Sequence, residues 1–399
     1  MTDSSSGPAS TIDARVVSMA LVAFVIGSLY LRQIVHWQHA ALFLVGGVLG
    51  LVLYHAAFGF TSAWRVLISD RRGAGVRGQM LMLAVACVLF FPVLGSGTPV
   101  FTDTVRGNVN PIGVSVAVGA FLFGLGMQLG GGCASGTLFT VGGGNSRMVV
   151  TLGGFIVGSV VGAAHAPWWQ SLPELEAVSL VESFGPGVAL VISLTAFGAI
   201  AGGTIIVERH RHGRRLPGPA PVRHGLARVM SGPWPLVAGA VGLAVANFAT
   251  LALAGRPWGV TSGFALWGSK AAATIGFEPA AWTYWSSPAR HASLVGNVFE
   301  DTTSVMNFGI LLGALMASGL AGRFKPVWSL SGRSLGAAIG GYGARLAYGC
   351  NIGAYFSGVA SGSLHGWFWL VAAFAGSMVG TQLRPKFGMI VERTPCPTP

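Results

Sequence analysis

Charge is the scarcest property of this sequence. Only 9% of the 399 residues are Asp, Glu, Lys or Arg, whereas 52% are hydrophobic. A soluble domain carries about 25% charged residues, so the shortage excludes an ordinary soluble enzyme. The chain has 24 Lys and Arg against 12 Asp and Glu. In so apolar a chain this excess indicates orientation in a lipid bilayer and not binding to nucleic acid.

Cysteine is also scarce, with four residues, which excludes a disulfide framework. No second set of ligands accompanies the cysteines, so we expect no metal and no cofactor. The Gly-x-x-x-x-Gly-Lys-Ser/Thr pattern is missing, which argues against ATP as a driving force within this chain. Glycine, by contrast, is abundant. Its 61 residues fit close helix packing in lipid and non-helical backbone at membrane depth.

Apolar runs of about 20 residues, enough to cross a bilayer, predict ten spans in two sets of five. They lie at 16–35, 40–57, 79–97, 112–130 and 148–166, and at 187–207, 234–254, 302–321, 333–348 and 366–383. Two shorter apolar pieces, 59–69 and 259–275, are interrupted by Gly, Thr and Ser. They match each other, because Gly-Phe-Thr-Ser at 59–62 pairs with Gly-Val-Thr-Ser at 259–262.

A doubled glycine-rich loop with one cysteine in each copy is the most informative pattern. Gly132-Cys133-Ala134-Ser135-Gly136 is matched by Gly349-Cys350-Asn351-Ile352-Gly353, and each is followed by Gly-Ser-x-Val-Gly, at 158–162 and 376–380. Because five spans per half is an odd number, the halves must enter the bilayer from opposite sides. We therefore expect an all-α polytopic membrane protein built as an inverted repeat of two five-span halves, with broken, re-entrant helices meeting at a central constriction.

The domain organisation follows from the same patterns. We expect the following parts: a tail at 1–15, a first repeat at 16–207 with re-entrant segments near 59–69 and 131–146, a basic linker at 208–233, a second repeat at 234–385 with re-entrant segments near 259–275 and 349–362, and a tail at 386–399.

Basic residues cluster in the loops 70–78 and 208–233 and near 323–333 and 384–386, while the loop 167–185 is acidic and has no Lys or Arg. Basic loops stay in the cytoplasm. This distribution predicts a multi-pass protein of the bacterial inner membrane with both termini in the cytoplasm.

Cys133 and Cys350 are the leading site candidates. A single buried cysteine is usually a small apolar packing residue, but two at matching positions of broken loops favour a function. A thiol is a soft, polarisable contact and a weak donor, which suits an anion that contains sulfur or selenium. The glycines beside the thiols leave backbone N–H groups uncovered, and such groups favour anions. These glycines are Gly132, Gly136, Gly349 and Gly353.

Charged residues at apparent membrane depth are the next candidates. Arg345, five residues before Cys350, could attract an anion or could instead bond the loop carbonyls. Lys270 could face the periplasmic entrance and Arg65 the cytoplasmic side, or both could reach to an interface. Asn351 could donate to an oxyanion or bond its own backbone. His365 and Trp367 are interpreted as interfacial residues.

These motifs resemble the YeeE/YedE family of bacterial inner-membrane sulfur-transport proteins. The resemblance rests on residues 131–136 and 345–354, and the continuation to Trp367 is similar to the longer YedE type. It implies an hourglass-shaped protein in which cysteine thiols pass thiosulfate along by S–H hydrogen bonds, often beside a small cytoplasmic sulfur-carrier protein. Family members of the thiosulfate type carry a further cysteine in the first broken segment. Here Thr61 or Ser62 would supply a hydroxyl in its place, with Thr261 and Ser262 at the matching positions of the second half.

Three functions remain open at this point. The first is permeation of thiosulfate, without catalysis, past the two thiols. The second is transport of a selenium compound or another soft anion on the same scaffold, since the longer YedE type is also linked with selenium metabolism. The third is a membrane sulfurtransferase in which a cysteine becomes a persulfide, which would need an activated thiolate beside a cation such as Arg345.

Overall fold

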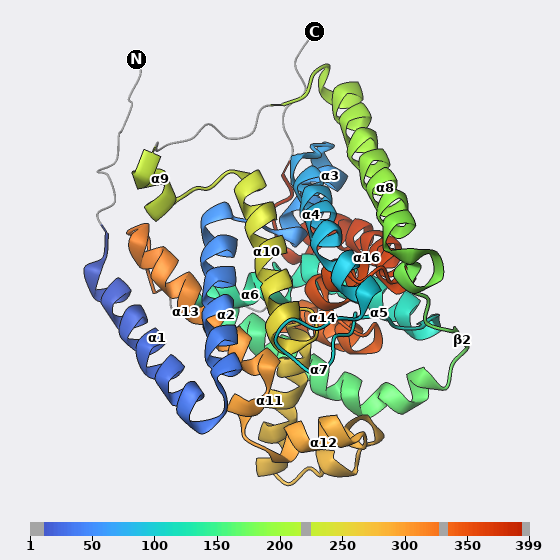
Figure 1. Ribbon diagram of the computed structural model, residues 1–399. Helices are drawn as coiled ribbons and strands as arrows, with labels where there is room; N and C mark the ends of the chain where they lie inside the picture. Colours follow the sequence, from blue (N-terminus) through green and yellow to red (C-terminus); the bar gives the residue numbers. More distant parts are fainter. Residues whose placement is uncertain (1–11, 217–224, 327–333, 393–399) are drawn as a thin grey trace.

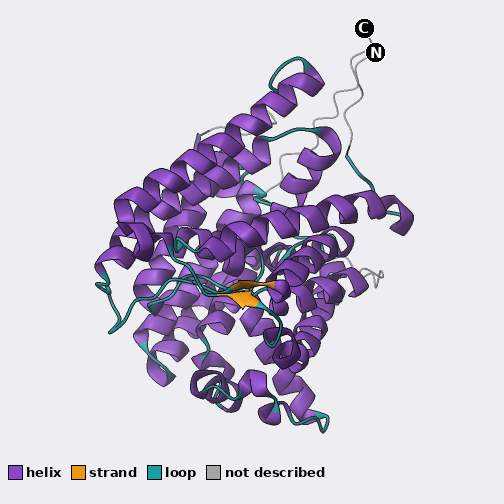
Figure 2. Ribbon diagram, turned by 90° about the vertical axis from the view of Figure 1, so that its right-hand side faces the viewer, coloured by secondary structure: helices purple, strands orange, loops and turns teal. Residues whose placement is uncertain are grey.

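The computed structural model describes residues 12–216, 225–326 and 334–392, and these residues are almost entirely helical (Figures 1 and 2). The long helices are α1 (Ala14–Ile34), α2 (Trp37–Ala56), α4 (Ala74–Ser96), α5 (Val114–Gly130), α7 (Arg147–Gln170), α8 (Leu180–His212), α10 (Leu236–Ala254), α13 (Thr302–Leu320) and α16 (Leu364–Leu383). The shorter elements are α3 (Phe60–Asp70), α6 (Ala134–Gly142), α9 (Gly225–Ser231), α11 (Thr261–Thr274), α12 (Pro288–Val295), α14 (Ser334–Leu346), the π-helix η4 (Asn351–Phe356), α15 (Ser357–Ala360) and two paired strands, β1 (Ile112–Gly113) and β2 (Glu174–Leu175).

Within the described ranges, eight helices are long and apolar enough to cross a membrane, and not the ten that the sequence predicted. Two expected spans, 333–348 and 366–383, are not among them. Helix α14, in the first of these, has 13 residues and so spans about 20 Å, less than the roughly 30 Å of a hydrocarbon core. Helix α16 has 20 residues, but its His, Gly and Trp residues lower its mean hydropathy.

Short helices occupy the segments that were expected to be broken. Helices α3 and α11 have 11 and 14 residues and follow the glycines at 59 and 259 closely. Helix α6, with nine residues, follows the first cysteine loop, and η4 with α15 follows the second. The predicted linker 208–233 is helical at both ends, because α8 continues to His212 and α9 covers part of the remainder.

The helices pack in pairs that correspond between the two halves. Helix α2 packs on α13 as α10 packs on α4, and α5 packs on α16 as α14 packs on α7. The peripheral helices obey the same relation, since α1 lies on α13 and α8 lies on α4 (Figure 1). Each of these contacts between a helix of α1–α7 and a helix of α8–α16 thus has a counterpart in which the two halves of the chain have changed roles.

The repeated Gly-Ser-x-Val-Gly motif shows this correspondence at atomic detail. In α7, a Cβ at Gly158 would overlap the Ala338 carbonyl oxygen, and the Ser159 hydroxyl donates to Gly341 O at 3.4 Å. In α16, a Cβ at Gly376 would overlap the Phe121 carbonyl oxygen, and the Ser377 hydroxyl donates to Gly124 O at 3.1 Å. Small residues bring backbones into direct contact here, as they do in membrane helices generally.

Candidate functional site

The first cysteine lies at the beginning of a short helix. Gly131 adopts a left-handed conformation (φ 84°) that ends α5, and Cys133 then caps α6 with extended backbone. The sulfur accepts a hydrogen bond from Gly136 N at 3.4 Å and lies 3.6 Å from the Ser135 hydroxyl. The residue is only 3% exposed. The sulfur thus lies at the positive end of a helix dipole.

The second cysteine has a corresponding position. Tyr348 (φ 57°) and Gly349 (φ 155°) both adopt positive φ before Cys350, a strained conformation for the tyrosine. Cys350 then caps the π-helix η4 and lies near the N–H groups of Ile352 and Gly353. Single π-helical turns are rare and occur frequently at functional sites. Both thiols therefore lie at helix N-termini inside broken segments.

The structure brings the two cysteine loops together with the starts of α3 and α11. Cys133 and Cys350 lie within electrostatic range of each other. The Thr61 hydroxyl of α3 lies beside the Cys133 thiol and forms no hydrogen bond with any other described residue. On the other side, a methyl group added at Gly353 would come 4.0 Å from the Gly259 Cα.

A cavity of about 880 Å³ opens on the side of the Cys350 loop. Gly349 and Gly353 of that loop line it, as do Thr261 and Ser262 of α11. Thr261 is 2% exposed, and the Ser262 hydroxyl donates to the Thr303 hydroxyl at 3.1 Å. The cavity therefore joins two of the predicted segments.

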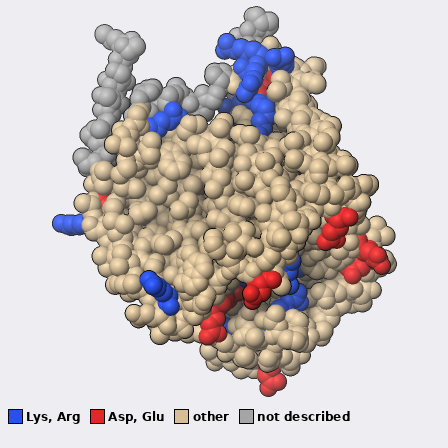
Figure 3. Space-filling view, in the orientation of Figure 1, with Lys and Arg blue, Asp and Glu red and all other residues tan. Residues whose placement is uncertain are grey.

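Positive charge dominates this cavity. Four arginines and a single carboxylate line it: Arg106, Arg256, Arg290, Arg345 and Asp301. In Figure 3, Lys and Arg atoms are visible inside a hollow in the lower part of the molecule, with acidic residues near its rim. The cavity can therefore concentrate anions.

Arg106 and Arg256 form the part of this charge that sequence reasoning missed. Their side chains have no hydrogen-bond partner within the described ranges, and the two guanidinium groups lie close enough to repel each other. Burial lowers the pKa of Arg256, and the Asp301 charge opposes this shift. The available signal was position, because Gly255-Arg256-Pro257-Trp258 directly precedes the predicted broken segment at 259–275.

The two basic candidates in the second half have different environments. Arg345 lines the cavity, but its guanidinium donates to the Tyr284 hydroxyl at 2.7 Å and not to the carbonyls of the cysteine loop. Lys270 donates to Leu294 O and Gly296 O, both at 2.6 Å, and so fastens α12 to α11. Lys270 is not among the residues that line the cavity.

A second, smaller pocket of about 190 Å³ lies beside α3. Gly59, Ser62, Arg72 and Glu208 are among its lining residues. The Ser62 hydroxyl donates to Gly59 O at 3.2 Å, so this predicted residue faces the pocket while Thr61 faces Cys133. The cavity and this pocket thus lie against the two matching short helices.

Asn351 is the most unusual polar residue of the site. It is fully buried, and neither its amide nitrogen nor its amide oxygen has a hydrogen-bond partner in the described part of the chain. A buried polar group left unpaired in this way costs about 1–3 kcal/mol. Tyr355, also in η4, stacks on Trp369 with the ring centroids 6.2 Å apart and contacts Trp64 edge-on.

Comparison with known proteins identifies the group to which this architecture belongs. A family model described as sulphur transport matches residues 55–379. The chain belongs to the sulphur transport family. It is 26% identical over 351 residues to the thiosulfate transporter TsuA of Spirochaeta thermophila, covering 81% of this chain and 92% of that protein.

Two further relatives of the sulphur transport family match a shorter stretch. The probable transporters YedE of Escherichia coli (strain K12) and Salmonella typhimurium are 31% identical over 147 residues, which is 35% of this chain. The match spans only about a third of their length, 36%. The family relation agrees with a transport protein.

Two interpretations of other residues are corrected or sharpened by the structure. His365 is not interfacial: it is fully buried, and its ring nitrogen Nε2 lies 3.1 Å from Ala347 O, behind the second cysteine loop. Trp367 is half-buried and stacks on Phe197.

Cys87 is a packing residue of α4 whose sulfur lies 3.7 Å from Val359 O. Cys396 lies outside the described residues.

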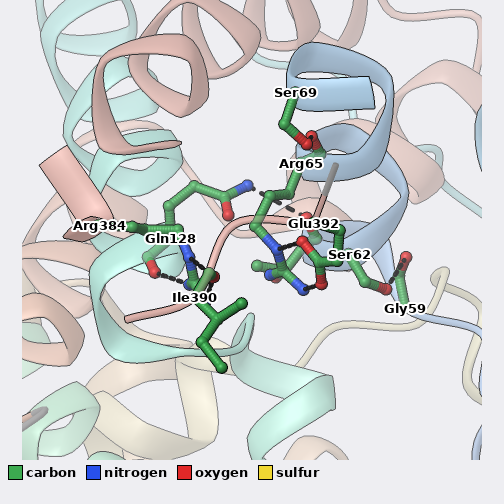
Figure 4. Close-up of polar contacts among 9 residues, drawn as sticks. Gly59, Ser62, Arg65, Ser69, Gln128, Arg384, Ile390 and Glu392 are labelled. Atoms are coloured by element: carbon green, nitrogen blue, oxygen red, sulfur yellow. Dashed lines mark hydrogen bonds and ion pairs between the residues drawn. The ribbon is translucent and has the colours of Figure 1, made fainter. Parts of the chain in front are cut away.

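Arg65 forms an ion pair with a carboxylate that follows the last helix. Its guanidinium forms two hydrogen bonds, of 2.7 and 2.6 Å, with the Glu392 carboxylate (Figure 4). This bidentate contact lowers the pKa of Glu392, so the pair is charged at neutral pH. A segment near the end of the chain is thereby attached to α3.

Proposed function

We propose that this protein is a channel-like transporter that carries thiosulfate inward across the bacterial inner membrane. The observation that carries the proposal is that Cys133 and Cys350 each cap a short helix, and that two glycines of the Cys350 loop, Gly349 and Gly353, line a cationic cavity. The 26% identity with a thiosulfate transporter over most of the chain supports the choice of anion.

The anion would enter from the periplasm into the arginine-lined cavity. It would then meet the N–H groups at the start of η4 and the Cys350 thiol, and pass to Cys133 at the start of α6. Two neutral S–H donors in series bind an anion favourably but weakly, which is what permeation requires. Thr61, beside Cys133, would act as a hydroxyl donor in the position where a third thiol is expected.

The architecture proposed with this function is an hourglass of two inverted halves. The corresponding helix pairs support a repeat whose second copy begins at α8, before the basic segment at 208–233. Both termini would lie in the cytoplasm, and a small sulfur-carrier protein could receive the anion there. With the termini in the cytoplasm, the 880 Å³ cavity would face the periplasm.

Two alternatives use the same residues. Selenium compounds or other soft anions would fit the same thiols, and competition among thiosulfate, sulfite, sulfate and selenite in liposome uptake separates them. A persulfide-forming sulfurtransferase is less well supported, because the Arg345 guanidinium bonds Tyr284 and not a cysteine. Mass spectrometry after exposure to thiosulfate would reveal a sulfur adduct on Cys350 only if that activity exists.

Cysteine substitution tests the proposal directly. We expect Cys133→Ala and Cys350→Ala each to lower thiosulfate uptake into proteoliposomes by at least about tenfold, the effect of roughly 1.4 kcal/mol on a barrier. Cys87→Ala is the matched control, because it removes a buried thiol that packs against α15 without lying at the constriction. Full uptake by the Cys133/Cys350 double variant, with a normal melting temperature, would refute the thiol pathway.

A further inference from the structure

The chain after α16 turns back and binds two separate helices, α5 and α3. It passes through a 3₁₀ turn, η5 (Arg384–Phe387), and then through residues 388–392, which we call the C-terminal strap. Arg384 is 7% exposed, and its guanidinium donates to Ile390 O through Nε at 3.1 Å and Nη2 at 3.0 Å (Figure 4). One buried side chain thus fixes the path of the strap.

The same guanidinium links the strap to the first cysteine loop. Its Nη1 atom donates to Gln128 O at 2.6 Å, in the last turn of α5. Gln128 is fully buried, and its side-chain amide donates to Thr61 O at 3.1 Å. Thr61 is the residue whose hydroxyl lies beside Cys133. A continuous set of hydrogen bonds therefore runs from the strap to the constriction.

The end of the strap contacts helix α3, the helix of Thr61, at a second point. Glu392 pairs with Arg65, one turn beyond Thr61 on α3. Helix α3 is thus fixed by Gln128 near its start and by Glu392 near its middle. The matching helix α11 is fixed instead by Lys270 to the backbone of α12, next to the large cavity.

The strap is attached mainly by polar contacts. Ile390 is 83% exposed, while Met389 is buried. Segments with few buried apolar contacts open locally at low cost. An attachment of this kind can be released without unfolding the helices that it connects.

We infer that residues 388–392 form a releasable strap that holds α3 against the Cys133 thiol and closes the inner side of the path. This inference rests on the proposed function, because the path is the one defined by the two thiols. Release of the Arg65–Glu392 contact would let α3 move and would expose Cys133 to water. Cys350 would be unaffected, since its loop faces the other cavity.

Alkylation of the native thiols in purified protein in detergent, without substrate, tests the strap. Peptide mass spectrometry measures the rate of modification of Cys133 and Cys350 separately. We expect Glu392→Gln and Arg65→Gln each to raise the Cys133 rate by about fivefold, the upper range for one ion pair, with the Cys350 rate unchanged. The charge-reversed pair Arg65→Glu/Glu392→Arg should restore slow modification.

Lys386→Gln is the matched control, because it removes a charge from an exposed residue of η5. An unchanged Cys133 rate in folded single variants would overturn the strap, and so would an equal rise at both cysteines, which indicates general loosening. The test is independent of uptake. If Cys133→Ala left uptake intact, the proposed function would fail while the alkylation result stood.

Discussion

At the scale of single residues, charge in the cavity has the clearest functional consequence. Arg106 and Arg256 have no side-chain hydrogen-bond partner in the described ranges and face a space large enough for a hydrated anion. A cation held in this way attracts substrate more than it supports the fold. Its removal should therefore change the apparent affinity and leave the maximal rate largely intact.

We expect Arg256→Gln to raise the KM for thiosulfate uptake about fivefold, corresponding to roughly 1 kcal/mol for one partly screened charge. The dependence of KM on ionic strength should weaken in the same variant. Arg32→Gln is the control, because Arg32 is an exposed cation in the last turn of α1. A loss of maximal rate at constant KM would instead place Arg256 in the permeation step itself.

The residue scale also shows how far sequence reasoning could reach. Cys133 and Cys350 were recognisable because their loops are doubled in the sequence. Arg106 and Arg256 belong to no repeated pattern, and a charge in a loop between two helices gives no sign of whether it faces lipid, water or a cavity. The role of Lys270 was equally hidden, since its partners Leu294 and Gly296 contribute only backbone carbonyls.

At the scale of helices, direct backbone contact at glycine stabilises the frame around the site. Gly158 of α7 faces the Ala338 carbonyl of α14, whereas a Cβ at Gly153 of the same helix would meet nothing within 4 Å. The added methyl group must therefore push the two helices apart at the first position and is accommodated at the second.

We expect Gly158→Ala to lower the midpoint of thermal unfolding in detergent by several degrees, in keeping with an overpacking cost of about 1–3 kcal/mol. Gly153→Ala should leave the midpoint unchanged or raise it slightly, because alanine favours the helix. Equal midpoints for the two variants would contradict the close contact of α7 with α14.

Helix length explains one of the two predicted spans that the structure lacks among the membrane-crossing helices of its described ranges. Hydropathy identifies a run of apolar residues but not the point at which the helix breaks, so α14 was counted as a span although it has 13 residues. The four broken segments were more predictable, because glycine, serine and threonine interrupt an apolar run there. The C-terminal strap was unpredictable, since its contacts join residues far apart in sequence.

At the scale of the whole molecule, the distribution of charge predicts the sidedness of the protein. The last turn of α8 carries Arg209, His210, Arg211 and His212, while the loop before α8 contains Glu174 and Glu176. An impermeant thiol reagent applied to intact cells should therefore label Glu174→Cys, and it should label Arg209→Cys only after lysis. Both positions are exposed. The reverse pattern would place the large cavity on the cytoplasmic side.

The arginine-lined cavity has a consequence for the energy supply of transport. Cations and helix N-termini raise the local concentration of an anion, but they act equally on entry and exit and so cannot set a direction. Moving a dianion into a cell against a membrane potential of 100 mV, negative inside, costs about 4.6 kcal/mol of free energy. At equilibrium the anion would therefore be about three orders of magnitude more concentrated outside the cell than inside. Net inward flow through such a passage therefore depends on how fast metabolism removes the anion on arrival.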